Sequence, residues 1–283
     1  MDAQLQQIRD QQKATWNKFS SGWKKWDSFN MDFLRPMGDA IMNYLQIKDG
    51  DLVLDIATGT GEPGLTIAAL TPKGKVTGTD LSEDMLSIAQ IHAATKGIKN
   101  YETKVADVCE LPFADNSFDA ISCRIVFMFF PDMQLAAREM LRVLKPGGRM
   151  STSVWGSAEK NPWIAMMTNT LNRNMDIPAP PPGAPGMFRC SRPGLMSEIL
   201  AKAGFTHIAE QPISGQINYG SPEKYWENMT EVAAPVVNAM SRADDATKAR
   251  IEKEVFAQLR PLTRAGALPL DYAAIVLYGE KGA

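Results

Sequence analysis

Apolar positions along the chain follow three different patterns. Within the first 30 residues the large aromatic side chains recur at spacings of three, four and three, which places them on one face of a helix: Trp16, Phe19, Trp23 and Trp26. From about residue 50, short apolar runs alternate with helical patterns, and this alternation ends after residue 155. We therefore predict three parts: an N-terminal helical lid segment (1–48), a core (49–155) and a C-terminal half with lid insertions and the last strands (156–283).

The central part predicts five buried strands separated by helices. The strands are expected over residues 51–56, 75–80, 101–106, 118–123 and 149–155. Helices are expected to begin at Leu65 and at Ser82 and to cover Met133–Leu144, ended by Pro146 and Gly147. This succession predicts an α/β fold with a Rossmann-like, doubly wound, mostly parallel sheet.

The C-terminal half predicts insertions around a few further elements. Pro178–Gly186 is rich in proline and is typical of a stiff connector. Beyond it we expect helices over residues 195–203, 222–240 and 244–259, and strands over 205–209 and 272–278. With the N-terminal helix, the segments 156–195 and 210–265 are expected to form a lid over the carboxyl edge of the sheet.

Composition narrows the classes of function. The 283 residues contain 30 basic and 32 acidic side chains, a net charge of −2, so no strong positive field favours nucleic acid as a partner. No apolar run approaches the roughly 20 residues of a membrane span, and we expect a cytoplasmic protein. Cys109, Cys123 and Cys190 lie far apart and form no metal-ligand spacing with His92 or His207, so no metal site is predicted.

A glycine-rich turn after the first strand carries the main functional signal. Gly59, Gly61 and Gly64 form a GxGxxG pattern between a predicted strand and a predicted helix, and Asp80 ends the next strand. In that context the pattern indicates a nucleotide site, because glycines allow close backbone approach and a carboxylate can accept from both ribose hydroxyls.

Charge in this turn bears on the identity of the nucleotide. Asp55 directly precedes the turn and Glu62 lies within it, and both carboxylates would oppose the pyrophosphate of a dinucleotide. S-adenosylmethionine has no phosphate and carries a sulfonium and an ammonium, which acidic neighbours favour. The charges therefore favour S-adenosylmethionine as the cofactor.

Four ordered segments resemble the motifs of class I S-adenosylmethionine-dependent methyltransferases, and in particular the ubiquinone and menaquinone biosynthesis branch. They lie within residues 50–155 and comprise Leu54–Gly61, Thr79–Leu86, Ala106–Asp119 and Leu141–Gly148. Ala57 stands where many members have glycine, a small change. The resemblance implies methyl transfer from S-adenosylmethionine to a small acceptor.

The resemblance also implies which residues bind the donor. Asp80 would hold the ribose hydroxyls, Leu81 and Met85 would flank the adenine, and Asp107 with the backbone of Val108 would meet its polar edge. The methionine part would lie along the first motif, whose expected donor-binding residues are Asp55, Ala57, Thr58, Gly59 and Gly61. For Met85 the alternative is an ordinary methionine of the apolar core.

Residues after the fourth strand and in the lid suggest the acceptor side. Arg124 could pair with the donor's carboxylate, with an anionic substrate group or with a structural carboxylate. Trp23, Phe127 and Trp155 are the expected walls of an acceptor pocket, although most of Phe127–Phe130 is expected in the core. The aromatic content of the lid favours an apolar or aromatic acceptor and either C- or O-methylation.

No catalytic base is identified. His92 and His207 fall on a helix and a late strand away from the expected site, and Tyr219, Tyr225 and Asp132 remain as candidates. Methyl transfer depends chiefly on alignment of the two reactants, so a base is needed only for acceptors that lose a proton late.

Other functions stay open at this stage. A non-catalytic S-adenosylmethionine-binding protein would share the same motifs, and a nicotinamide-dependent oxidoreductase would share the fold. Methylation of a metalloid through the three cysteines, and methylation of nucleic acid, are disfavoured by the cysteine spacing and by the neutral charge. A homodimer is left open.

Overall fold

The fold centres on one twisted sheet of seven strands. The structure is a computed structural model that describes residues 3–178, 181 and 183–283. The strand order is β3-β2-β1-β4-β5-β7-β6. The strands are β1 (Leu52–Ile56), β2 (Lys75–Asp80), β3 (Tyr101–Val105), β4 (Phe118–Arg124), β5 (Leu144–Trp155), β6 (Thr206–Asn218) and β7 (Pro269–Glu280).

Ten α-helices surround this sheet in the described part of the chain. They are α1 (Ala3–Lys25), α2 (Asp27–Leu45), α3 (Gly64–Leu70), α4 (Glu83–Thr95), α5 (Met133–Val143), α6 (Pro162–Asn174), α7 (Leu195–Ala203), α8 (Pro222–Val232), α9 (Ala234–Met240) and α10 (Asp245–Leu259). None of the described helices is long and apolar enough to cross a membrane.

The strand order fixes where a ligand can bind. The strands β1 to β5 pair in parallel, and the direction of winding reverses between β1 and β4, which are neighbours. At such a reversal the connections leave the sheet on opposite sides and open a crevice at the carboxyl ends of the strands. Strand β7 runs antiparallel between β5 and β6.

Alternating side chains on the central strands build two apolar layers. Val53 of β1 packs with Ile41 of α2 and Ile67 of α3 on one face. Leu54 and Ile56 of the same strand belong to the larger core that includes α5 and α7. Because successive strand residues point to opposite faces, a run of consecutive apolar residues is what a sheet covered on both sides requires.

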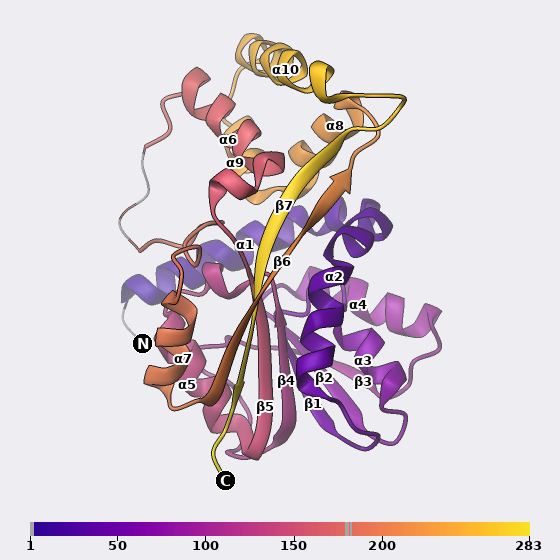
Figure 1. Cartoon of the computed structure of the whole chain (residues 1–283), viewed down its shortest axis with the longest axis vertical. Helices are drawn as coiled ribbons and strands as arrows, with labels where there is room; N and C mark the ends of the chain where they lie inside the picture. The colour runs from indigo at the N-terminus through magenta and orange to yellow at the C-terminus, as the bar shows by residue number, and fades with distance from the viewer. Residues whose placement is uncertain (1–2, 179–180, 182) are drawn as a thin grey trace.

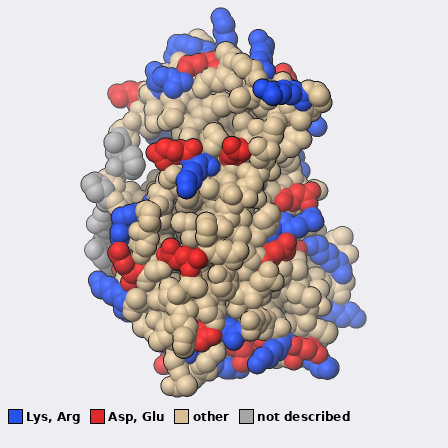
Figure 2. Space-filling model, in the orientation of Figure 1, with Lys and Arg blue, Asp and Glu red and all other residues tan. Residues whose placement is uncertain are grey.

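The helices of the segments expected to form a lid lie beyond the carboxyl edge of the sheet. Figure 1 shows the long strands β6 and β7 extending past the parallel strands, with α6, α8, α9 and α10 gathered around their far ends. Helix α1 crosses between these helices and the sheet. On the face in Figure 2, acidic and basic side chains are interspersed rather than gathered by sign.

The predicted fold class is confirmed, and most predicted strands lie within one or two residues of those observed. The structure differs in the C-terminal half, where β6 and β7 are longer than expected because they pair along nearly their whole length. The helix expected over 222–240 is two helices, α8 and α9, divided at Ala233 immediately before the Ala234–Pro235 pair. The predicted connector Pro178–Gly186 includes residues 179, 180 and 182, which lie outside the described residues.

Helices α1 and α8 approach closely through a glycine. A Cβ atom added to Gly22 would lie 2.2 Å from the backbone oxygen of Glu231. The same contact holds Lys25 and Trp26 close to the Glu231 carboxylate, to which they donate at 2.8 and 2.7 Å. Gly22 therefore sets how near the N-terminal helix lies to the lid.

We predict that Gly22→Ala destabilises the protein. Alanine favours a helix over glycine by about 1 kcal/mol, but the added methyl meets backbone that cannot move aside, and overpacking costs typically 1–3 kcal/mol. Gly38→Ala is the matched control. Gly38 lies inside helix α2, and a Cβ there would make only ordinary van der Waals contacts, at 3.7 Å or more, with Arg124 and Pro63. Urea unfolding should show lower stability for the first variant and equal or higher stability for the second; equal behaviour would contradict the close approach.

Candidate functional site

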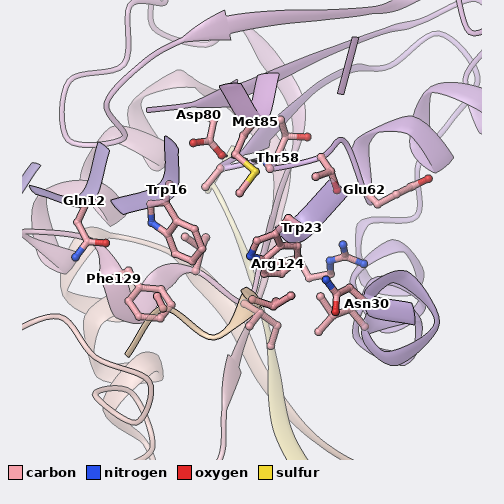
Figure 3. Close-up of a pocket in the computed structure, with 18 of the residues that line it drawn as sticks. Gln12, Trp16, Trp23, Asn30, Thr58, Glu62, Asp80, Met85, Arg124 and Phe129 are labelled. Atoms are coloured by element: carbon pink, nitrogen blue, oxygen red, sulfur yellow. Dashed lines mark hydrogen bonds between the residues drawn. The ribbon is translucent and has the colours of Figure 1, made fainter. Parts of the chain in front are cut away.

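A cavity opens at the carboxyl ends of β1, β2 and β4, under the N-terminal helices and α8. Figure 3 shows side chains of the N-terminal helices, such as Trp23 and Asn30, around one space with Asp80 and Arg124 from the strand ends. Nine of the eleven predicted donor-binding residues line it, namely Ala57, Thr58, Gly59, Asp80, Leu81, Met85, Asp107, Val108 and Arg124. Trp23 and Trp155, predicted for the acceptor side, line the same cavity.

The glycine-rich turn has the backbone that the sequence requires. Gly59 and Gly61 have φ angles of 57° and 114°, in the region that glycine adopts at little cost. A Cβ on Gly61 would lie 2.7 Å from Leu65, so this glycine lets α3 pack close to the turn rather than lining the cavity. Ala57, at φ 50°, adopts the same region with a small side chain.

Hydrogen bonds to the Asp55 carboxylate hold the glycine-rich turn in place. This carboxylate accepts hydrogen bonds from Thr58 Oγ1 at 2.5 Å, Ser122 Oγ at 2.6 Å and Gly64 N at 3.1 Å. Burial raises the pKa of Asp55 to about 6, against the lowering effect of these bonds. Asp55 does not line the cavity, so the structure gives it the role of fixing the turn instead of touching a ligand.

Glu62 is not the free negative charge that the sequence suggested. Its carboxylate accepts from Lys96 Nζ at 2.5 Å and from both Thr66 N and Thr66 Oγ1. Although burial raises the pKa of Glu62, the bonds from Lys96 and Thr66 outweigh it and the pKa is lowered overall. Asp55 thus lies outside the cavity lining, whereas Glu62 lines the cavity with its charge paired to Lys96, so the two carboxylates are not both free to face a ligand.

Asp80 is the carboxylate that faces the cavity at this edge. Its two oxygens accept from Gly59 N at 3.0 Å and Ser82 N at 2.9 Å. Burial raises the pKa of Asp80 to about 6, and the backbone bonds partly offset this. In a dinucleotide site the N–H groups of such a turn meet a phosphate, whereas here Gly59 donates to a carboxylate, which opposes an anion at this point.

Helix α4 begins at this point, as the sequence predicts. Ser82 is its N-cap and accepts from Met85 N at 3.1 Å. Ser82 Oγ also donates to Asn17 of α1 at 2.6 Å, and Lys13 pairs with Glu83 at 2.8 Å. The N-terminal helix is thus attached across the mouth of the cavity beside Asp80.

Asp107 carries an oxygen without a partner. Its Oδ1 accepts from Cys109 N at 2.8 Å, while Oδ2 is buried and has no hydrogen bond in the described part of the chain. The nearest cation, Arg9 of α1, lies 3.9 Å from Oδ2. A buried carboxylate oxygen of this kind is suited to accept from an amino group of a ligand.

Arg124 is a cation on the cavity wall. Its guanidinium donates to Met31 Sδ at 3.2 Å, and no carboxylate lies within 4.0 Å of it among the described residues. Burial lowers the pKa of Arg124, and the more distant charges of Asp55, Glu62 and Asp27 raise it. The prediction that it could belong to an ordinary structural ion pair is not met.

Aromatic rings form a further part of the cavity wall. Phe33 stacks on Trp155 with ring centroids 5.5 Å apart and meets Trp163 edge-on at 5.3 Å. Phe127, predicted as a wall residue, is fully buried against Phe130 and does not line the cavity. The prediction for Phe127 is corrected in favour of Phe129, which lines the cavity and packs against Trp16, because the short helix Phe127–Phe129 turns the first ring inward.

Candidates for a base become fewer. Tyr225 donates to the Trp163 carbonyl at 2.7 Å, and Asp132 caps α5 by accepting from Gln134 N and Leu135 N, so both are engaged elsewhere. Tyr219 lines the cavity, but burial raises its pKa well above the usual value, which keeps its hydroxyl protonated. The three thiols are buried outside the cavity, and no group of three or more metal-ligating side chains occurs among the described residues.

Sequence reasoning did not find the polar residues of the lid. Asn30 of α2 and Asn228 of α8 both line the cavity and are 4% exposed. Asn30 follows Trp23 by seven residues, two helical turns, so the aromatic stripe extended by one step would have included it. Asn228 carried no comparable signal, because only the folded chain brings α8 against α1.

Residues 47–210 match the model of a family described as a methyltransferase domain. A demethylmenaquinone methyltransferase of Staphylococcus carnosus is 38% identical over 109 residues, which are 38% of this chain and 44% of that relative. The chain therefore matches less than half the length of this curated relative. The resemblance predicted from the four motifs is confirmed by these matches.

Solved structures share the fold. A protein of Bacillus subtilis known as YcgJ superposes with a TM-score of 0.60 at 22% identity, covering 88% of this chain and 99% of that chain. Phosphoethanolamine N-methyltransferase 2 of Haemonchus contortus, in complex with phosphomonomethylethanolamine and S-adenosylhomocysteine, has a TM-score of 0.54 at 18% identity, covering 88% of this chain and 53% of that chain. At these identities the likeness is one of fold.

We predict that Asp55→Ala lowers the free energy of unfolding by about 2 kcal/mol, because Ser122, Thr58 and Gly64 lose a buried acceptor. Asp55→Asn keeps one such oxygen and should lose less. Asp51→Ala, at the start of the same strand with one exposed bond from Lys48 N, is the control and should change stability by less than about 1 kcal/mol. Chemical denaturation measures all three; equal losses for Asp55→Ala and Asp51→Ala would contradict this role.

Proposed function

We propose, from the premise that the chain belongs to the family of methyltransferase domains, that it transfers the methyl group of S-adenosylmethionine to a small, apolar or aromatic molecule. The observation that carries the proposal is the continuity of one cavity. The residues suited to a nucleoside, Asp80 and Asp107, line the same space as the aromatic lid residues Trp23 and Trp155. Donor and acceptor can therefore meet inside the protein.

The cavity residues fit the donor's polar groups at separate points. In the proposal, the Asp80 carboxylate accepts from the two ribose hydroxyls and Asp107 Oδ2 accepts from the adenine amino group. The cavity-facing position of Asp80 and the missing hydrogen bond at Asp107 Oδ2 support these assignments. Leu81, Met85 and Val108 supply the apolar surface between them. S-adenosylmethionine supplies a methyl group already activated by its sulfonium.

Arg124 is suited to the donor's carboxylate. The Arg124 guanidinium and Pro63, at the end of the glycine-rich turn, both lie next to Gly38 of α2. A Cβ atom added to Gly38 would be 3.7 Å from the guanidinium and 3.9 Å from Pro63. The methionine part of the donor is expected along that turn. A bidentate pair with a carboxylate would replace the weak bond to Met31.

Positioning is the main contribution that the chain makes to the reaction. The turn and β4 fix the donor side, and the stacked rings of Phe33 and Trp155 fix the acceptor side. Such alignment contributes several kcal/mol to a displacement reaction, and enclosure by α1 keeps water away from the reacting atoms. The transfer breaks the bond between sulfur and methyl, forms the new bond to the acceptor and leaves S-adenosylhomocysteine, and the acceptor gives up one proton. No described residue that lines the cavity is a histidine, and Tyr219 is held protonated. The proposal therefore has this proton leave to bulk solvent, from an acidic hydroxyl or enol before the acceptor is enclosed or with the product after transfer.

The proposed class of acceptors is not limited to quinones. The named relative acts on demethylmenaquinone, but the match covers only part of its length. The N-terminal helical segment (1–48) and parts of 156–283 are proposed as the lid that selects the acceptor, and the C- or O-methylation outcome follows from that selection. A homodimer and the exclusion of nucleic acid stay predictions.

We predict that Asp80→Ala weakens S-adenosylmethionine binding at least tenfold, which corresponds to about 1.4 kcal/mol, because both ribose hydroxyls lose their acceptor. Asp84→Ala, an exposed acid two residues into the next helix, is the matched control and should bind as the parent does. Equilibrium dialysis with methyl-labelled S-adenosylmethionine measures both. Unchanged affinity in Asp80→Ala, or tighter binding of NAD by the parent, would overturn the donor assignment.

The same labelled donor tests the reaction itself. With a panel of phenols, hydroquinones and enols, we expect the label to move into an organic extract with at least one acceptor, and to stay in the donor when boiled protein is used. Tight donor binding without transfer to any panel member would instead favour the non-catalytic binding protein.

Donor affinity should also depend on pH through Asp80. Burial raises the pKa of Asp80 to about 6, and only the ionised carboxylate accepts from both hydroxyls. Affinity is therefore expected to be constant near pH 7 and to fall towards tenfold per unit as the pH drops below about 6. Asp55 has a pKa of about 6 as well, so the comparison is with Asp80→Asn, whose affinity should be weaker at pH 7 and lose most of this slope. An equal slope in both proteins would assign the effect to Asp55.

A further inference from the structure

Three side-chain nitrogens beside the cavity have no hydrogen-bond partner. They are Trp23 Nε1, Asn30 Nδ2 and Asn228 Nδ2, and each belongs to a residue that lines the cavity. Among the described residues only six buried side-chain N or O atoms lack a partner, and a fourth is Asp107 Oδ2 on the donor side. Unsatisfied polar groups are therefore concentrated at this cavity.

The three nitrogens come from helices that the fold brings together. The backbone continues helically through the junction of α1 and α2, since Trp26 N bonds to Gly22 O at 3.0 Å and Asn30 N to Trp26 O at 2.9 Å. Trp23 and Asn30 thus lie two turns apart on one face. Asn228 lies one turn before Glu231, the residue against which Gly22 packs, so α8 brings it to the same end of α1. Figure 3 shows Trp23 and Asn30 at the cavity together with Arg124.

These groups are costly where they are if nothing binds them. A buried donor without a partner costs about 1–3 kcal/mol, and an apolar side chain of the same shape would avoid that cost. Asn30 and Asn228 are nearly completely buried, and neither amide makes any hydrogen bond within the described part of the chain. Their presence at one cavity, with the indole of Trp23, is explained if a ligand supplies the missing acceptor.

We propose that Trp23, Asn30 and Asn228 form an acceptor-binding site that hydrogen-bonds an oxygen substituent, a hydroxyl or a carbonyl, on an aromatic acceptor. The inference rests on the proposed function and adds the chemical class of the acceptor and the residues that select it. The indole N–H is only a donor, so the ligand atom it meets must be a hydrogen-bond acceptor. Each amide, by rotating about its last bond, can present either its NH2 group or its oxygen.

The surroundings favour a neutral oxygen on a ring. Phe33, Trp155 and Trp163 provide stacked and edge-on aromatic surface in the same cavity. The ionised residues of the cavity wall are Glu62, Asp80, Asp107 and Arg124, from the turn and the strand ends, and none comes from α1, α2 or α8. Arg124, which Figure 3 shows together with Trp23 and Asn30, is the one cation among them and is assigned to the donor's carboxylate in the proposed function. The hydrogen-bond donors that remain for the acceptor are neutral and lie among aromatic rings, so they suit a phenol, a quinol or an enolic carbonyl better than a phosphate or a carboxylate.

The location of these residues explains why the family match does not identify the acceptor. All three lie outside residues 47–210, the part that matches the methyltransferase domain. The oxygen anchor would fix which ring atom lies next to the methyl group, so the two helices before the domain and one after it decide which position is methylated.

The test uses a pair of probes that differ by one oxygen, 1-naphthol and naphthalene, with S-adenosylhomocysteine at saturation. Equilibrium dialysis should show the parent protein binding 1-naphthol roughly tenfold more tightly than naphthalene, the ratio that a hydrogen-bonded oxygen of about 1.4 kcal/mol gives. Trp23→Phe, Asn30→Leu and Asn228→Leu should each lower this ratio several-fold by weakening 1-naphthol binding only. Each variant should unfold at the parent's temperature or above, because it removes an unsatisfied buried group.

Trp226→Phe is the matched control. Trp226 lies on α8 two residues before Asn228, but it packs on Phe256 and is not part of the cavity wall. It should leave the 1-naphthol to naphthalene ratio unchanged. S-adenosylhomocysteine affinity, measured in every variant, separates this site from the donor site and should stay constant.

Each outcome has one meaning. Equal binding of the two probes by the parent, failure of both to bind while S-adenosylhomocysteine binds, or an unchanged ratio in all three variants would overturn the oxygen-binding site and leave the proposed methyl transfer standing. Failure of the parent to bind S-adenosylhomocysteine would overturn the proposed function and this inference with it. Loss of folding in one variant leaves the other two to decide.

Discussion

The carboxylate of Asp55 joins three separate pieces of backbone at the place where the sheet changes its direction of winding. It accepts from Ser122 on the neighbouring strand, from Thr58 in the turn and from Gly64 at the start of α3. The pKa of about 6 shows that burial opposes the charge, and the hydrogen bonds offset only part of that effect. The turn is therefore fixed by a carboxylate whose burial is itself unfavourable. The positions of Gly59 and of the Asp80 carboxylate to which it donates depend on the turn.

One consequence is the orientation of the donor side. With the turn fixed, Gly59 N donates to the Asp80 carboxylate, which also accepts from the backbone N–H of Ser82, the N-cap residue of α4. The site's electrostatics follow from these bonds more than from the number of acids in the motif. Glu62 is paired with Lys96 and Asp55 lies outside the cavity lining, so the described charged groups that line the cavity without a close ion pair are Asp80, Asp107 and Arg124. The proposed function assigns them to the ribose hydroxyls, the adenine amino group and the carboxylate of the donor. The preference for S-adenosylmethionine over a dinucleotide survives, but for a different reason from the one the sequence suggested.

A second consequence concerns the lid. Helix α1 is attached to the donor side through Lys13 and Asn17, and to α8 through Gly22 and Lys25. One helix thus contacts both halves of the cavity. The unsatisfied nitrogens of Trp23, Asn30 and Asn228 lie where these two sets of contacts meet. A single N-terminal helix therefore contacts both the residues proposed for the donor and those proposed for the acceptor.

The sequence by itself determined the α/β fold, the succession of the five parallel strands along the chain and most of the residues that line the cavity at the strand ends, because these depend on local signals. Apolar runs, glycine spacing and the acid after β2 act over a few residues and do not need the rest of the chain. It could not show that Phe127 turns into the core, that Glu62 is neutralised by Lys96, or that Asn228 reaches the cavity. Those outcomes depend on contacts between residues that are far apart along the chain, such as Gly22 against Glu231. Trp23 was expected at the cavity from the sequence, but that Asn228 joins it there was decided only by the tertiary structure, since helices α1 and α8 meet solely through packing.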